Sequence, residues 1–194
     1  MTLRYDTRSR VSTYTQSWVS GEPDFGVFDS IATTVLSSST STITFSSIPA
    51  GYKHLQIRFL SRTDRANNED VILLRFNSDS AANYSSHYLY GDGASAGSGG
   101  ASGASSIPID GCVGASTTAS IFGGGIVDIL DYGSADKYKT VRALTGYDRN
   151  GAGLFVFDSG NWRSTSAVSS ITLISKNSAN FVQYSHFALY GIKG

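Results

Sequence analysis

The chain is poor in charged residues and in cysteine. Only 15% of its 194 residues are charged, the formal net charge is zero, and the one cysteine is Cys112. Binding to phosphate backbones needs a basic surface, so this charge balance argues against nucleic acid as the main partner. A single cysteine cannot form an internal disulfide. We expect Cys112 to be a small buried hydrophobic residue of a protein that folds in a reducing compartment.

Long apolar runs are also missing. No run approaches the roughly 20 apolar residues that a membrane-spanning helix needs. Residues 1–20 lack the apolar segment of a secretory signal peptide. We therefore expect no membrane partner and no export by the ordinary Sec route.

Signatures of catalysis and metal binding are absent from the sequence as well. There is no Gly-x-Ser-x-Gly nucleophile elbow and no Gly-Lys-Ser/Thr phosphate loop. His54, His87 and His186 lie inside expected strands and do not form a cluster with the ligand spacing of a zinc site. Asp128 and Asp131 are three residues apart on an expected strand, so they would face opposite sides. We expect no enzymatic activity, no metal and no cofactor.

Two segments match ligand-binding motifs by letter only. Residues 91–96 read G-x-G-x-x-A, but no helix follows that could direct its dipole at a pyrophosphate. Residues 77–80 offer too few oxygen ligands for calcium and are expected to form an Asx-turn. A carboxylate pair assembled across a sheet, as glycosidases use, stays open as the weakest alternative.

The residues that are abundant favour β-structure. Serine and threonine make up about a quarter of the chain, with 21 glycines and 12% aromatic residues, which suits many short strands joined by tight turns. In residues 52–62, Leu55, Ile57 and Phe59 alternate with polar residues. Such segments recur roughly every 10–15 residues, and no helical period is present. The sequence predicts an all-β protein with a jelly-roll-like antiparallel β-sandwich.

We expect two parts: an extended N-terminal arm in residues 1–24 and a single β-sandwich domain in residues 25–194. Within the domain, the Gly/Ser/Ala-rich residues 91–106 are expected to form a flexible loop. The arm carries arginine and aromatic side chains that suit attachment to a neighbouring subunit. Its candidate partner-binding residues are Arg4, Tyr5, Arg8, Arg10, Tyr14 and Trp18.

One motif occurs twice, about one hundred residues apart, in Tyr84–Gly91 and Tyr184–Gly191. The two segments share Tyr, Ser, Leu, Tyr and Gly at the same parity. Because strand side chains alternate, the two tyrosines of each copy should face one way and the Leu and Ser the other. Duplication of a half-domain and chance similarity between tyrosine-rich strands both remain open. In either case, the motif indicates a scaffold.

Aromatic residues provide the best indication of a ligand. The chain has 11 tyrosines, and aromatic faces stack on sugars or on protein partners. Trp162 lies in an expected loop at residues 158–163. It is therefore the ring that we expect to contact a partner or a glycan.

Three ordered segments resemble β-sandwich virion structural proteins of tailed bacteriophages, notably phages of marine and freshwater bacteria. They are Ser47–Arg58, then Asp128–Tyr132 with Lys137–Val141, then Phe187–Lys193. The resemblance covers roughly residues 27–194 and leaves out the arm. It implies a virion location with assembly in the host cytoplasm, and other virion proteins as partners. It brings no catalytic residues with it.

The leading expectation is a non-enzymatic phage virion structural protein. It would be a capsid cement or decoration protein that docks through the arm and the sandwich surface, as a homo-oligomer whose repeated contacts raise avidity. The alternative is a tail or fibre component whose sandwich binds a carbohydrate or receptor through tyrosines and Trp162. A glycan-degrading enzyme is the third and weakest hypothesis.

Overall fold

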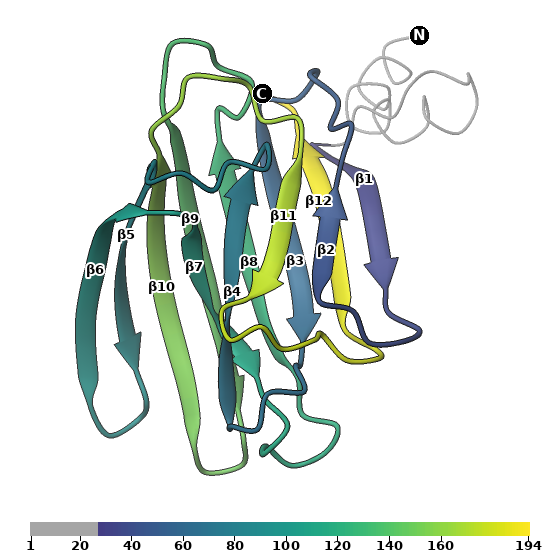
Figure 1. Cartoon of the computed structure of the whole chain (residues 1–194), viewed down its shortest axis with the longest axis vertical. Coiled ribbons are helices and arrows are strands. Elements are labelled where there is room, and N and C mark those ends of the chain that lie inside the picture. Colours follow the sequence, from purple (N-terminus) through teal and green to yellow (C-terminus); the bar gives the residue numbers. More distant parts are fainter. Residues whose placement is uncertain (1–26) are drawn as a thin grey trace, which may run out of the picture.

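The computed structural model describes residues 27–194, which form two packed antiparallel sheets (Figure 1). The large sheet has the order β1-β12-β3-β8-β9-β10-β5-β6 and the small sheet the order β2-β11-β4-β7. The large-sheet strands are Phe28–Val35 (β1), His186–Ile192 (β12), His54–Ser61 (β3), Gly123–Leu130 (β8), Lys139–Asp148 (β9), Gly153–Trp162 (β10), Tyr84–Gly91 (β5) and Ala96–Ala104 (β6). The small-sheet strands are Thr42–Phe45 (β2), Ile171–Ser175 (β11), Glu69–Phe76 (β4) and Ile107–Val113 (β7).

The chain alternates between the two sheets in a jelly-roll path. It passes from β2 to β3, back to β4, across to β5 and β6, back to β7, across to β8, and finally through β11 to β12. The strands β8, β9 and β10 form a meander where a jelly roll has a single strand. The predicted all-β, jelly-roll-like sandwich is therefore confirmed for residues 27–194. The predicted arm of residues 1–24 lies outside the described residues.

The core lies between the sheets and follows the alternation read from the sequence. Leu55, Ile57 and Phe59 of β3 are all buried, as the period of two predicts. Cys112 belongs to the same core, and burial raises the pKa of its thiol to about 12. The expectation of a small buried hydrophobic residue at this position is confirmed.

The Gly/Ser-rich segment expected to be a loop is a strand instead. β6 runs antiparallel to β5 along the edge of the large sheet. A Cβ atom at Gly97 would lie 2.6 Å from the ring of Tyr90, and one at Gly99 would lie 2.5 Å from the hydroxyl of Tyr88. These glycines leave room for tyrosine rings that reach over β6 from β5. The prediction of a flexible loop was wrong because strand pairing and ring packing outweigh the weak β-propensity of glycine.

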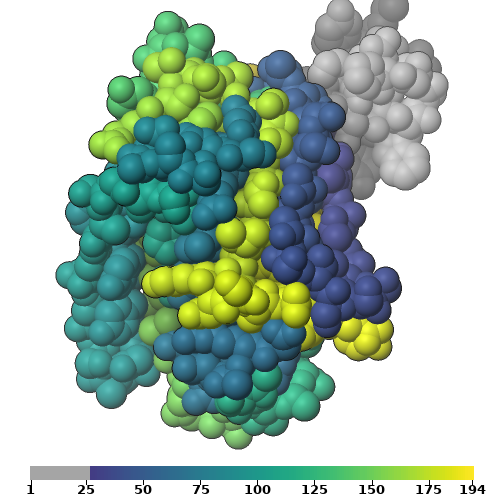
Figure 2. Space-filling view, in the orientation of Figure 1, coloured from purple at the N-terminus to yellow at the C-terminus, as the bar shows by residue number. Residues whose placement is uncertain are grey.

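Among residues 27–194, no helix is long and apolar enough to cross a membrane. The small sheet covers the middle of the large sheet, while β5 and β6 extend beside it (Figures 1 and 2). The large sheet thus has an inner surface that is only partly covered and an outer surface that no other strand of the described chain covers. These two surfaces hold the candidate sites.

Candidate interaction surfaces

Trp162 does not lie in a loop and is not available to a partner. It is the last residue of β10, only 3% exposed, and its ring packs against Phe76 and Tyr84. The sequence suggested a turn because Gly160 stands just before it. In the fold, Gly160 allows β7 to approach, since a Cβ atom there would lie 2.5 Å from Ile107. The expected role of Trp162 in binding a partner or a glycan was therefore wrong.

The indole of Trp162 instead helps to hold a turn. Its Nε1 donates to Oδ2 of Asp79 at 2.7 Å, and Asn83 donates to the same oxygen. The backbone N–H of Ala81 donates to Oδ1 of Asp79, which forms the expected Asx-turn. The donors on Asn83, Trp162 and Ala81 hold the pKa of Asp79 below its ordinary value. This carboxylate thus stabilises the connection from β4 to β5.

The six arm candidates cannot be placed. Arg4, Tyr5, Arg8, Arg10, Tyr14 and Trp18 all lie outside the described residues. Attachment through the arm stays a prediction from the sequence.

The outer surface of the large sheet carries a continuous line of exposed apolar side chains. Leu89 of β5 pairs with Phe157 of β10, Phe157 with Leu144 of β9, and Leu144 with Ile126 of β8. Their exposed fractions are 53%, 52%, 41% and 38%, respectively. We call these four residues the apolar row. Large apolar side chains that lie side by side and exposed often mark an interaction surface.

A second exposed line runs one step further along the strands. Phe155 of β10 is in register with Gly146 of β9, Gly146 with Gly124 of β8, and Gly124 with Leu60 of β3. Phe155 also packs edge-on against Phe157, with 5.1 Å between ring centroids. The two glycines add no side chain between Phe155 and Leu60. The apolar surface therefore extends beyond the apolar row.

Polar residues border the apolar row on its other side. Arg142 of β9 is in register with Asp128 of β8, and Asp128 with Gln56 of β3. Gln56 donates to Asp128 at 2.8 Å and accepts from Arg58 at 2.8 Å. The guanidinium of Arg58 lies 5.5 Å from the centroid of the Tyr190 ring. An apolar centre with an ordered polar margin is typical of a protein interface.

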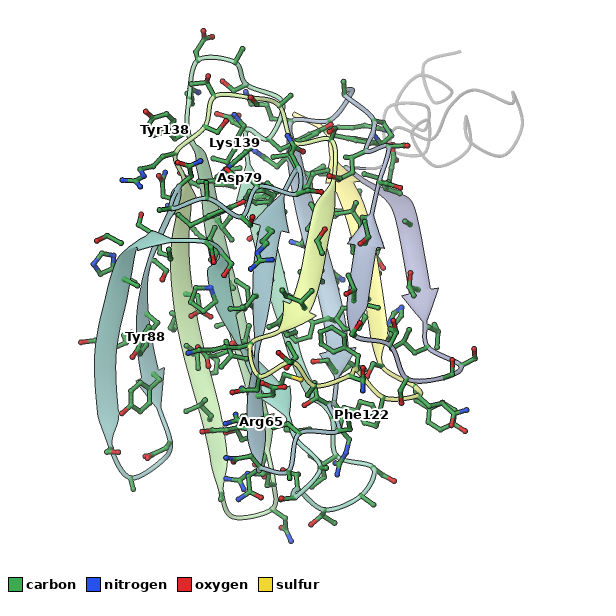
Figure 3. All side chains as sticks on the ribbon, viewed as in Figure 1. Arg65, Asp79, Tyr88, Phe122, Tyr138 and Lys139 are labelled. Atoms are coloured by element: carbon green, nitrogen blue, oxygen red, sulfur yellow. The ribbon has the colours of Figure 1, made fainter. Side chains whose placement is uncertain are left out.

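A cleft of about 510 Å³ opens on the inner surface of the large sheet, beside the small sheet. Tyr88 and Tyr90 of β5 and Val156 of β10 line it from the large sheet. Pro108 and Asp110 of β7 line it from the edge of the small sheet. Its volume lies in the range of small-molecule sites, roughly 300–1,000 Å³. Figure 3 labels Tyr88 on β5 and Arg65 in the connection before β4, both of which line the cleft.

Hydrogen bonds and ring contacts order one end of this cleft. The hydroxyl of Tyr147 donates to Oε2 of Glu69 at 2.7 Å, and Arg149 lies 5.5 Å from the centroid of the Tyr147 ring. Burial, and then the hydrogen bond to Glu69, raise the pKa of Tyr147, so the ring stays a neutral donor. Arg65 donates to the carbonyl oxygen of Glu69 at 2.8 Å. These contacts hold the side chains at this end of the cleft in place.

Two carboxyl groups meet next to the cleft. Asp158 of β10 is 5% exposed, and its Oδ2 atom is buried without a hydrogen bond from residues 27–194. Burial, and then the charge of Asp110, raise the pKa of Asp158 to about 7. Burial also raises the pKa of Asp110. The sequence could not reveal this pair, because the two residues lie on different sheets and are far apart along the chain.

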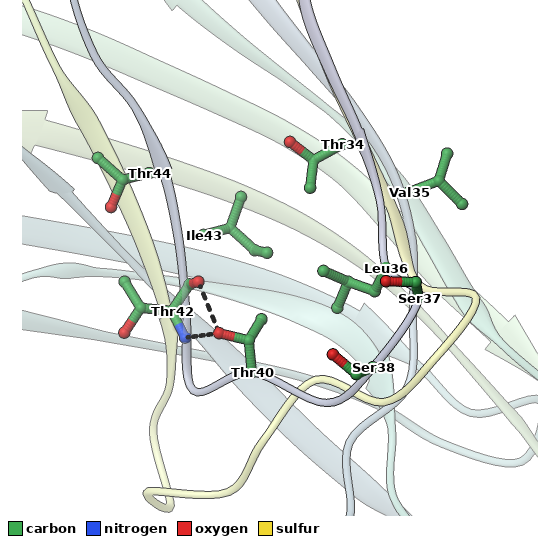
Figure 4. Close-up of a pocket in the computed structure, with 9 residues that line it drawn as sticks. All are labelled: Thr34, Val35, Leu36, Ser37, Ser38, Thr40, Thr42, Ile43 and Thr44. Carbon is green, nitrogen blue, oxygen red and sulfur yellow. Dashed lines mark hydrogen bonds between the residues drawn. The ribbon is translucent and has the colours of Figure 1, made fainter.

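Another hollow is formed by one continuous segment and carries no comparable chemistry. It lies at the connection between β1 and β2, at residues 34–44, where Thr40 hydrogen-bonds to the backbone of Thr42 (Figure 4). Its lining holds hydroxyl and aliphatic side chains without a ring or a charge. It offers little for specific recognition.

Comparisons with known proteins add no family to these surfaces. The chain matches no protein-family model, and no curated protein is significantly similar to it in sequence. Within residues 27–194, no three His, Cys, Asp or Glu side chains come together as a metal site would require. The apolar row and the tyrosine-lined cleft therefore carry the functional argument.

Proposed function

We propose that this protein is a non-enzymatic structural component of a tailed-phage virion, most simply a capsid cement or decoration protein. The observation that supports this proposal best is the exposed apolar row across four neighbouring strands of the large sheet. Such a surface suits a protein that is covered when it assembles. The resemblance of residues 27–194 to virion proteins gives the setting: assembly in the host cytoplasm and a final place in the particle.

The partner proposed for the outer surface is a second copy of this chain. Eight strands about 4.8 Å apart, each about eight residues long with a rise near 3.4 Å, span roughly 1,000 Å². A stable interface buries about 800 Å² on each partner, so one sheet face is large enough. Two sheets can pack face to face with their strands nearly aligned, as they do within a sandwich.

The charges on this surface are self-complementary about one particular axis. A two-fold axis parallel to the strands, between β8 and β9, sets each strand of one copy opposite its mirror position in the other. Arg142 then faces the partner's Asp128, and Leu144 faces the partner's Ile126. Phe157 faces the partner's Arg58, because both lie two strands from the axis at the same level. Oppositely charged groups and a cation facing an aromatic ring both favour this pairing.

Sedimentation velocity of the full chain tests the dimer. The wild type should sediment as a dimer at micromolar concentration, and Phe157→Arg should sediment as a monomer because it sets a second cation against the partner's Arg58. Thr44→Arg is the matched control, since Thr44 is an exposed strand residue of the small sheet, away from the outer surface of the large sheet. A wild-type monomer at every concentration would contradict the proposal.

A charge exchange tests the orientation of the two copies. Arg142→Asp and Asp128→Arg should each weaken the dimer through like charges across the axis. The double variant should regain dimer stability, because the two charges are merely exchanged. No recovery in the double variant would rule out this axis.

Incorporation into particles tests the virion role directly. An antibody against the chain should label phage particles from the source culture, and mass spectrometry of purified particles should detect many copies. Removing residues 1–24 should leave a folded sandwich that no longer enters particles, if the arm provides attachment. Unchanged incorporation would reject the arm, and absence from all particles would reject the virion role.

The alternative function, a tail or fibre component that binds a glycan or receptor, no longer has Trp162 to support it. It gains a different observation, the cleft beside Tyr88 and Tyr90. A carbohydrate site and a virion position are compatible, since many copies on one particle would raise avidity for a cell surface.

A further inference from the structure

Two tyrosine rings form a platform at the base of the cleft. Tyr88 and Tyr90 are neighbours on the inner face of β5, and their ring centroids are 6.3 Å apart with planes tilted by 34°. Both rings reach over the backbone of β6, where Gly99 and Gly97 leave space for them. Both also line the cleft. Because the glycine strand supports the rings, aromatic surface is presented to the cleft at little cost in conformational entropy.

Positively and negatively charged side chains line the cleft around this platform in equal number. The carboxylates that line the cleft are Glu69, Asp92 and Asp110, and the cations are Arg65, Arg149 and Lys176. A phosphate ligand would meet three carboxylates, and a cationic ligand would meet three positive groups. A neutral ligand with many hydroxyl groups can use both kinds of partner, because a hydroxyl donates to carboxylates and accepts from Arg and Lys.

The two aromatic rings also favour a sugar as the ligand. One face of a pyranose ring is lined by C–H groups, which pack against the face of a tyrosine. The platform offers two such rings side by side, enough for consecutive sugar units. A wholly apolar ligand would leave the six charged groups of the rim without compensation for their lost water.

We propose that this cleft binds a neutral oligosaccharide, with sugar rings stacked on Tyr88 and Tyr90 and hydroxyl groups paired with Glu69, Asp110 and Arg149. The site lies on the inner surface of the large sheet, away from the apolar row, and the inference is independent of the proposed dimer.

Saturation-transfer NMR of the full chain with maltohexaose, cellohexaose, xylohexaose and chitohexaose tests the site. A printed array of bacterial polysaccharides extends the search to longer and branched glycans. At least one glycan should bind. Tyr88→Ala and Tyr90→Ala should each raise its dissociation constant about tenfold, the usual loss for a central aromatic contact. His87→Ala is the matched control, because His87 directly precedes Tyr88 in sequence but lies on the outer face of β5.

A second variant separates loss of the ring from loss of the fold. Gly99→Ala should displace the Tyr88 ring and weaken binding several-fold while every ring is retained, because its Cβ would lie 2.5 Å from the Tyr88 hydroxyl. Ser98→Ala, one position away on β6, should bind as the wild type does. Equal binding by Tyr88→Ala and His87→Ala, or no binding by any glycan tested, would overturn the site.

The outcomes for the two proposals are distinguishable. Glycan binding is read in solution on a monomer or a dimer, whereas the virion role is read from particles. Release of shorter sugars during the titration would overturn the non-enzymatic part of the proposed function and would leave the binding site standing.

Discussion

The two copies of the repeated motif occupy similar places but turn opposite faces to the core. Each lies next to an edge strand of the large sheet, β5 beside β6 and β12 beside β1. In the first copy, Tyr84 is completely buried and Leu89 is 53% exposed. In the second copy, Leu189 is completely buried, while Tyr184 is 69% exposed and stands before β12 begins.

This reversal shows that shared letters do not make the two strands equivalent. The alternation of Tyr84 and Leu89 on β5 is as the parity predicts. The covered face differs, so the inner side of β5 is aromatic and partly open to the cleft, and the inner side of β12 carries Phe187 and Leu189 and is closed. One motif thus lines an open cleft in one place and a closed core in the other, which disfavours a functional duplication.

The largest expected effect is a contrast between the two leucines. Leu189→Ala should lower the free energy of unfolding by about 4 kcal/mol, because it leaves a cavity in the core. Leu89→Ala should change it by no more than about 0.5 kcal/mol, since that side chain faces outward. Urea unfolding at low protein concentration, where any dimer dissociates, measures both. Equal losses would show that the two copies are equivalent after all.

The next effect comes from Asp158 of β10, which lies beside the inner face of the first copy. Asp158 is in register with Tyr88, and its pKa in the fold is about 7, above its ordinary value of 3.8. The fold therefore favours the neutral carboxyl, and the stability it contributes is complete below pH 4 and lost as the pH rises through 7. Asp158→Asn should then stabilise the protein by roughly 2 kcal/mol at pH 8 and by little at pH 4. Asp136→Asn, at an exposed position, is the control in urea unfolding at both values.

A smaller effect separates the first tyrosine of each copy. The hydroxyl of Tyr84 accepts from the backbone N–H of Phe76 at 3.0 Å and donates to the carbonyl oxygen of Asp79 at 3.1 Å. Tyr84→Phe should cost about 1–2 kcal/mol, since it leaves a buried N–H without its partner. Tyr184→Phe should have almost no effect, because the ring of Tyr184 is exposed. Thermal unfolding of the two variants side by side provides the measurement, and a loss in Tyr184→Phe would show a hidden contact.

The alternating strands could be predicted because their signal is local. Leu55, Ile57 and Phe59 repeat with the period of the strand, and the sheet places them on one face. The Gly/Ser-rich segment could not be recognised as β6, because its place depends on rings that β5 supplies. Trp162 was misplaced for a related reason. The glycine before it reads as a turn, yet it serves a close approach between two sheets.

The candidate sites were predictable only in kind. A surplus of tyrosine pointed to a surface that binds a ligand, but nothing local separated Tyr88 and Tyr90 from the tyrosines of the core. The cleft gathers residues from β4, β5, β7, β9 and β10, which are distant along the chain. The apolar row likewise needs the register of four strands, and that register is set by pairing between distant segments.

The sequence by itself determined the β-class, the alternation along each strand and the burial of Cys112. These follow from backbone geometry and hydrophobicity, which act within a few residues. Only the tertiary structure decided which face of each strand is covered, because that depends on where the small sheet ends against the large one. The same pattern of tyrosine and leucine therefore became part of a closed core in β12 and, in β5, placed tyrosines in an open cleft and a leucine in the apolar row.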